Sequence, residues 1–121
     1  MIKYHKEIGF KENDVILAKA LILVLNRQKI IFSRHSLGEL IQEKNCVEIG
    51  QFLKDYVFNF NDIFEIVVNN GIIEKIGFRV NFNEKDVIFM LSNNKTVITC
   101  WTCYKIDKHY TLNKNNYAFI S

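Results

Sequence analysis

The sequence predicts an α+β domain in which helices come first and a four-stranded antiparallel β-meander follows. Residues 15–25 form an apolar stretch that is too long for a typical strand and suits a helix. From residue 61 onward, apolar runs of strand length alternate with short polar turn segments. The 121 residues, 49% of them hydrophobic and 24% charged, suit one domain, 1–121. We expect its helical half at about 10–57 and its sheet half at about 61–117.

The first helix is expected to begin at Glu12 or Asn13 and to run to about Arg27. Residues 15–25 are apolar on every side of this helix except at Lys19. Soluble monomers rarely expose apolar area on this scale, so we expect 15–25 to be buried in the monomer or in a homodimer contact. The stretch is shorter than the roughly 20 residues of a membrane-spanning helix. With no signal-peptide pattern before it, we expect a cytoplasmic protein without membrane contact.

Two further helices are expected before residue 57, after a short extended segment at 30–32. Ser36 and Glu39 have the spacing of a capping box, so the second helix is expected to start at Ser36. Its apolar face would carry Leu37, Leu40 and Ile41. The third helix is expected over 47–56, with Ile49, Phe52, Leu53 and Tyr56 at helical spacing.

The meander is predicted from three short turns between apolar runs. The turns are expected at 69–71, 83–86 and 92–95, and the first contains Asn69-Asn70-Gly71. They separate strands at 63–68, 72–82, 87–91 and 96–102. Because short turns join neighbouring strands, each strand should pair antiparallel with the next one.

The three cysteines predict neither a disulfide framework nor a metal site. An odd number of cysteines argues against a closed disulfide framework. Cys100 and Cys103 have CxxC spacing, but within a strand they would point to opposite faces. No second pair completes a zinc site, so we expect ordinary thiols, no metal and no cofactor.

The net charge of +3 is concentrated toward the end of the chain. Between residues 95 and 117, one aspartate, Asp107, opposes four lysines: Lys95, Lys105, Lys108 and Lys114. This segment suits a phosphate-bearing partner such as RNA. A solvated lysine face is the alternative.

Two histidines are candidates for acid–base chemistry. His35 lies at the expected start of the second helix, where the helix dipole favours a neutral imidazole and attracts anions. It can act as a general base, while the neighbouring Arg34 binds phosphate. His109 lies near Thr111 among the lysines. Cleavage of RNA by its own 2′-hydroxyl needs a base, an acid and cations at the phosphate, and it needs no metal. The alternatives are a histidine that packs at the helix start and a polar surface loop.

Two residues of the predicted sheet are candidates for RNA contact. Arg79 alternates with Phe78 and Val80, so its side chain should face away from them and can reach a phosphate. Trp101 can stack on a base. A surface arginine and a core tryptophan are the alternatives.

The order of these motifs resembles that of small proteins of phages and mobile elements related to BrnT and RelE-type toxins, within the barnase, EndoU and colicin-like group. The motifs are 32–36 (Phe-Ser-Arg-His-Ser), 96–99 with Trp101, 107–112 and Tyr117. The resemblance implies helices before an antiparallel sheet whose face cleaves RNA without metal. The positions it implies are Arg34, His35, Arg79, Thr99, His109 and Thr111. The apolar helix before residue 30 has no counterpart in that group.

Two classes of function follow from the sequence. The first is a metal-independent, toxin-like endoribonuclease, with His35 and His109 as acid–base pair and a cognate antitoxin as partner. It requires both histidines on one surface. The second is a non-catalytic binding module, of the immunity type or a phage accessory protein, that acts through the apolar first helix or the basic C-terminal face.

Overall fold

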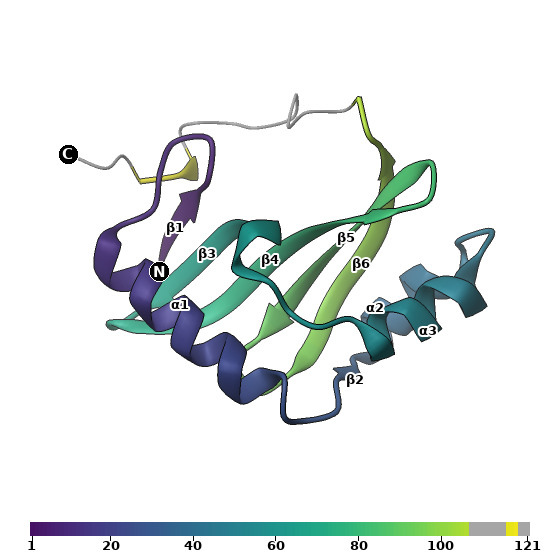
Figure 1. Cartoon of the computed structure of the whole chain (residues 1–121), viewed down its shortest axis with the longest axis horizontal. Coiled ribbons are helices and arrows are strands. Elements are labelled where there is room, and N and C mark those ends of the chain that lie inside the picture. The colour runs from purple at the N-terminus through teal and green to yellow at the C-terminus, as the bar shows by residue number, and fades with distance from the viewer. Residues whose placement is uncertain (107–115, 119–121) are drawn as a thin grey trace.

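A six-stranded mixed sheet forms the centre of the protein in the computed structural model (Figure 1). The structure describes residues 1–106 and 116–118. Within them the strand order is β1-β3-β4-β5-β6-β2, and three α-helices accompany the sheet. The predicted α+β class is therefore confirmed. None of the helices in the described ranges is long and apolar enough to span a bilayer.

The four runs of the predicted meander form the middle of the sheet. They are β3 (Ile63–Asn69), β4 (Ile72–Phe82), β5 (Lys85–Ser92) and β6 (Thr96–Tyr104), each antiparallel to the next. All three turns contain residues with positive φ, which asparagine and glycine tolerate best: Asn70, Gly71, Asn83 and Lys95. The polar turn residues thus separate the strands in the order that the sequence indicated, but the second turn is shorter than predicted, because β5 already begins at Lys85.

The sheet is larger than predicted, and its strands do not all follow the helices. β1 (Ile2–His5) precedes the first helix and pairs antiparallel with β3. β2 (Ile31–Phe32) lies between two helices and pairs parallel with β6. The four predicted strands do follow the helices, but the prediction of a four-stranded sheet was incomplete, because β1 and β2 extend it to six strands. β2 coincides with the extended segment expected at 30–32, but its pairing with β6 was not predicted, and the four residues of β1 are too few to give a strand signal on their own.

One face of the sheet, which we call the covered face, packs against α1 (Glu12–Leu25) and α3 (Cys46–Asp55). Phe78 of β4 and Phe89 of β5 are fully buried there, and their rings stack with centroids 5.1 Å apart. Tyr56, which follows α3, packs edge-on against both rings. The hydrophobic core therefore lies between these helices and the covered face.

Only one side of α1 lies against the sheet. Ala18, Ile22 and Leu25 are buried, whereas the opposite side exposes four large apolar residues, namely Ile16, Leu17, Leu23 and Val24. Within the monomer the stretch 15–25 is therefore buried along one side only, and its burial in a homodimer contact stays a prediction. A helix that crosses one face of a sheet can bury only one stripe of its surface, whatever the hydrophobicity of the rest.

The second helix, α2 (Arg34–Ile41), begins earlier than predicted. Its cap is Ser33, whose side chain accepts a hydrogen bond from the backbone N–H of Ser36 at 3.0 Å. The assignment of Ser36 as the cap was wrong because two serines three residues apart give the same signal. Ser36 is instead buried within the first turn. Of the expected apolar face, Leu40 is buried, while Leu37 and Ile41 are exposed.

Carboxylates of α2 and the residues after it cover the edge of β6 beyond its short pairing with β2. Glu39 accepts a hydrogen bond from the backbone N–H of Cys100 at 3.1 Å. Glu43 accepts from the N–H and the hydroxyl of Thr102. An open strand edge invites pairing with other chains, so these side chains occupy donors that would otherwise be available for it.

Candidate functional site

The face of the sheet opposite α1 and α3 carries most of the charged strand residues. We call it the second face. Successive side chains of a strand point to opposite sides, so the register assigns its members directly. They are Lys3 and His5 of β1, Glu65 and Val67 of β3, Lys75, Gly77 and Arg79 of β4, Asp86, Ile88 and Met90 of β5, and Thr99 and Trp101 of β6.

One row of residues crosses five strands of the second face in register. His5 pairs with Glu65, Glu65 with Gly77, Gly77 with Met90, and Met90 with Thr99. Gly77 leaves space in the middle of this row. A Cβ atom there would lie 2.8 Å from both the sulfur of Met90 and the ring of Phe64, so these two side chains close over the glycine. The row therefore has a tightly packed centre with polar groups at its ends.

A hollow of about 180 Å³ lies along this row. Its polar wall consists of Lys3, Glu65, Lys75 and Thr99, and its apolar wall includes Val67 and Met90. Neither lysine forms an ion pair with an acid in the described part of the chain. Two ammonium groups without an ion pair, together with the Thr99 hydroxyl, suit a phosphate-sized anion, while the Glu65 carboxylate lies in the same hollow.

Glu65 is held in place within the hollow. Its side chain is buried, and one carboxylate oxygen accepts a hydrogen bond of 2.6 Å from the hydroxyl of Tyr117. Burial raises the pKa of Tyr117, and the neighbouring Glu65 raises it further, so the phenol keeps its proton and remains a donor. The ring of His5 packs 5.1 Å from that of Tyr117. A carboxylate fixed in this way can accept a proton from a ligand through its second oxygen.

Of the residues predicted to bind RNA, Arg79, Thr99 and Trp101 lie on the second face. The guanidinium of Arg79 is mostly occupied, because its Nε lies 2.8 Å from Asp86 and its Nη2 donates to the carbonyl of Tyr104. Trp101, in contrast, is 38% exposed, so the core alternative was wrong. Lys105 is exposed, with its ammonium 4.0 Å from Asp86.

The predicted catalytic residues of α2 lie elsewhere. Arg34 and His35 occupy its first turn, along the edge of β6. The His35 side chain is 73% exposed, and its Nε2 lies 3.4 Å from the carboxylate of Glu39. The other predicted residues, Lys108, His109 and Thr111, lie outside the described residues. The pairing of His35 with His109 therefore remains a prediction.

The sequence interpretation missed Lys3, Glu65 and Lys75. Lys75 has the same alternation signal as Arg79, since the two lie four residues apart on one strand. Lys3 and Glu65 become neighbours of the site only through the pairing of β1 with β3, which no local pattern predicted. Lys95, which was counted with the basic segment, is buried in the turn between β5 and β6.

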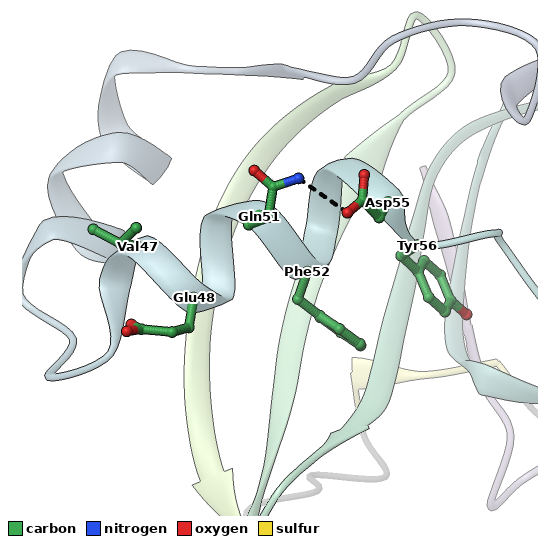
Figure 2. Close-up of a pocket in the computed structure, with 6 residues that line it drawn as sticks. All are labelled: Val47, Glu48, Gln51, Phe52, Asp55 and Tyr56. Carbon is green, nitrogen blue, oxygen red and sulfur yellow. Dashed lines mark hydrogen bonds between the residues drawn. The ribbon is translucent and has the colours of Figure 1, made fainter.

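A second hollow, of about 570 Å³, lies along α3. Figure 2 shows Phe52 and Tyr56 pointing to one side of the helix, with the Gln51 amide directed toward Asp55. Its lining contains two carboxylates, Glu48 and Asp55, and no cation. This hollow is thus larger than the one lined by Lys3, Glu65 and Lys75, but its two carboxylates make it electrostatically unsuited to phosphate.

The described residues contain no group of three or more His, Cys, Asp or Glu side chains that could hold a metal ion. No protein-family model, curated protein or solved structure matches the chain. The resemblance to the barnase, EndoU and colicin-like group therefore rests on the sequence motifs alone.

Proposed function

We propose that the second face binds single-stranded RNA. The observation that carries this proposal is the hollow in which two lysines, Lys3 and Lys75, have no acidic partner among the described residues. Half-buried lysines beside apolar side chains favour the binding of an anionic ligand that offers several oxygens. A phosphodiester provides such oxygens.

Trp101 extends the proposed site along the strand. It lies two residues from Thr99 on the same face, a spacing of about 7 Å in a strand. A base stacked on Trp101 can therefore belong to the nucleotide whose phosphate reaches Thr99, or to its neighbour. Stacking on an aromatic ring combined with lysine contacts to the backbone is a common mode of binding single strands.

Metal-independent cleavage is the stronger form of this proposal. The RNA 2′-hydroxyl would lose its proton to a base and attack the adjacent phosphorus, and the 5′-oxygen would leave with a proton from an acid. Glu65 is an oriented carboxylate beside the proposed phosphate position and can serve as the base. Lys3 and Lys75 would stabilise the charge that develops on the phosphate. The acid would be His109, as expected from the sequence. Of the other residues expected from the sequence, His35 would be the alternative base, Arg34 and Lys108 further cations at the phosphate, and Thr111 a hydroxyl near His109.

The binding proposal can be tested through Trp101, because it is the only tryptophan in the chain. Its fluorescence should change when a short unstructured RNA is added, and the change should saturate. Each lysine that contacts a phosphate contributes about 0.7 to the slope of log affinity against log salt for a single strand. Lys3→Ala and Lys75→Ala should each lower the slope by about that amount. Lys54→Ala, at an exposed position on α3, is the matched control and should leave it unchanged.

The cleavage proposal has its own test. Product with a 2′,3′-cyclic phosphate should form in the presence of a chelator, and Glu65→Gln should lower its rate by about 10²–10⁴-fold. The same oligonucleotide with 2′-deoxy sugars should bind and remain intact. Binding without any cleavage would favour the non-catalytic module over the enzyme. Absence of binding even at low salt would refute both, and would direct attention to a protein partner such as an antitoxin.

A further inference from the structure

The outer side of α1 forms an apolar stripe that the described fold does not use. Ile16 is 58% exposed, Leu17 45%, Leu23 67% and Val24 53%, and Ala20 between them is exposed as well. These positions lie within one sector of the helix, opposite the buried residues. We call them the outer stripe. Contiguous apolar surface of this kind in a soluble protein marks an association site.

The outer stripe is symmetric about Ala20. Leu17 and Leu23 lie three residues on either side of it, and Ile16 and Val24 lie four residues on either side. The pairs match in apolar character, and all four side chains are exposed. The inner positions Ala18 and Ile22, two residues away on either side, are both buried. The helix therefore presents a nearly palindromic apolar surface with a small residue at its centre.

We propose that α1 pairs with α1 of a second copy of this chain, antiparallel, about a two-fold axis that passes close to Ala20. In such a pair, each residue faces the position equally far from Ala20 on the other side of the partner's helix. Leu17 then faces the partner's Leu23, and Ile16 faces the partner's Val24. The small side chain at the centre lets the two helices approach closely.

The charges at the ends of the stripe support the antiparallel orientation. Glu12, in the first turn, and Arg27, just after the last turn, are both exposed. In the antiparallel pair, Arg27 faces the partner's Asn13, and the partner's Glu12 is the next residue along that helix, so a Glu12–Arg27 ion pair can form on each side of the apolar centre. In a parallel pair, Glu12 would instead lie near the partner's Glu12, and Arg27 near the partner's Arg27. The opposed helix dipoles also favour the antiparallel arrangement.

The size of the stripe sets the expected affinity. A stable interface buries about 800 Å² on each partner, and a stripe of five side chains on one helix provides less than this. We therefore expect a dissociation constant in the micromolar range, on the order of 1–100 μM. The dimer would then form or dissociate with protein concentration.

Sedimentation velocity of the full chain over a concentration series tests the proposal. The wild-type chain should shift from monomer to dimer in the micromolar range. Ala20→Glu places two carboxylates against each other at the axis and should raise the dissociation constant by at least about 30-fold, the effect of a residue at the centre of an interface. Val47→Glu is the matched control, since Val47 is also an exposed apolar residue, on a different helix. It should leave the dissociation constant unchanged.

Charge reversal tests the orientation. Glu12→Arg should weaken the dimer by repelling the partner's Arg27, and the Glu12→Arg/Arg27→Glu double variant should restore it. A double variant as weak as the single one would refute the antiparallel pairing. A wild-type chain that stays monomeric at several hundred micromolar, or a dimer insensitive to Ala20→Glu, would refute α1 self-association. Circular dichroism of each variant would establish that the helix is intact.

Discussion

The two faces of the sheet are built from the same strands but follow different rules. On β4, Ile76, Phe78 and Val80 point to the covered face and are buried under α1 and α3. The residues that alternate with them, Lys75, Gly77 and Arg79, point to the second face. A sheet face that packs against helices is restricted to apolar side chains of complementary shape, whereas the opposite face can carry charged side chains. The difference indicates where function can evolve without loss of the core.

The largest expected effect is the difference in the free energy of unfolding between a variant of the covered face and a variant of the second face. Phe78→Ala removes a fully buried ring that stacks on Phe89, so it should lower the free energy of unfolding by about 3–5 kcal/mol. Trp101→Ala removes a ring that is 38% exposed and should cost much less, about 1 kcal/mol. Chemical denaturation of both variants would measure the difference. Equal losses would mean that the second face is also a structural core.

Gly77 tests how tightly the centre of the second face is packed. Gly77→Ala places a methyl group 2.8 Å from the sulfur of Met90 and from the ring of Phe64, so both side chains must shift. We expect a loss of about 1–3 kcal/mol in the free energy of unfolding. The matched control is Gly38→Ala on α2, where no neighbouring atom lies within 4 Å. Because alanine favours a helix over glycine, the control should be stabilised by about 0.5–1 kcal/mol.

If Gly77→Ala were as stable as the wild type, Met90 and Phe64 would have to move without cost. The second face would then be loosely packed at its centre. In that case the hollow beside it would be a poor site for a fixed phosphate, and the lysine variants should show weak, uniform effects on RNA binding.

The contrast between the faces also explains what the sequence could predict. Alternation along β4 predicted that Arg79 faces away from Phe78 and Val80, because a strand's side chains alternate with a period of two. Thr99 was expected from the resemblance and Trp101 from base stacking, and the register of β6 with β5 places both on the same face as Arg79. The partners of those residues on β1 and β3 could not be predicted, since pairing between residues 2–5 and 65–68 is a long-range contact. Lys3 and Glu65 were missed for that reason.

The helices show the same limit. Hydrophobicity predicted where α1 lies, but not that half of its apolar surface would stay exposed, because the amount buried depends on which elements cover it. The cap of α2 was misassigned by one turn because Ser33 and Ser36 give equivalent local signals. Glu39, expected to cap its own helix, instead accepts from Cys100 on β6, a contact that only the tertiary fold defines.

Cys100 and Cys103 provide a chemical probe of the two faces, with the smallest expected effect on folding. Cys100 points to the covered face, and Cys103 pairs with Asp86 on the second face. Burial raises the pKa of the Cys100 thiol to about 12, and the carboxylates of Glu43 and Glu39 add to the increase. At pH 8 its thiolate fraction is about 10³-fold below that of an ordinary cysteine, so it should not react with a thiol reagent.

The Cys46→Ser/Cys103→Ser variant leaves Cys100 as the only thiol and allows this to be measured. Native protein at pH 8 should show no labelling, and unfolded protein should react fully.

The raised pKa of Cys100 also has a consequence for the stability of the fold. The unfolded state loses this proton at its usual pKa of 9.0, whereas the folded state keeps it. The thiol's contribution to stability is therefore complete below pH 9 and is lost as the pH rises toward 12. Replacing Cys100 with alanine in the same background should reduce this alkaline loss. Rapid labelling of native Cys100 would show instead that the edge of β6 under Glu39 and Glu43 opens readily, and that the covered face is less well closed there than its burial indicates.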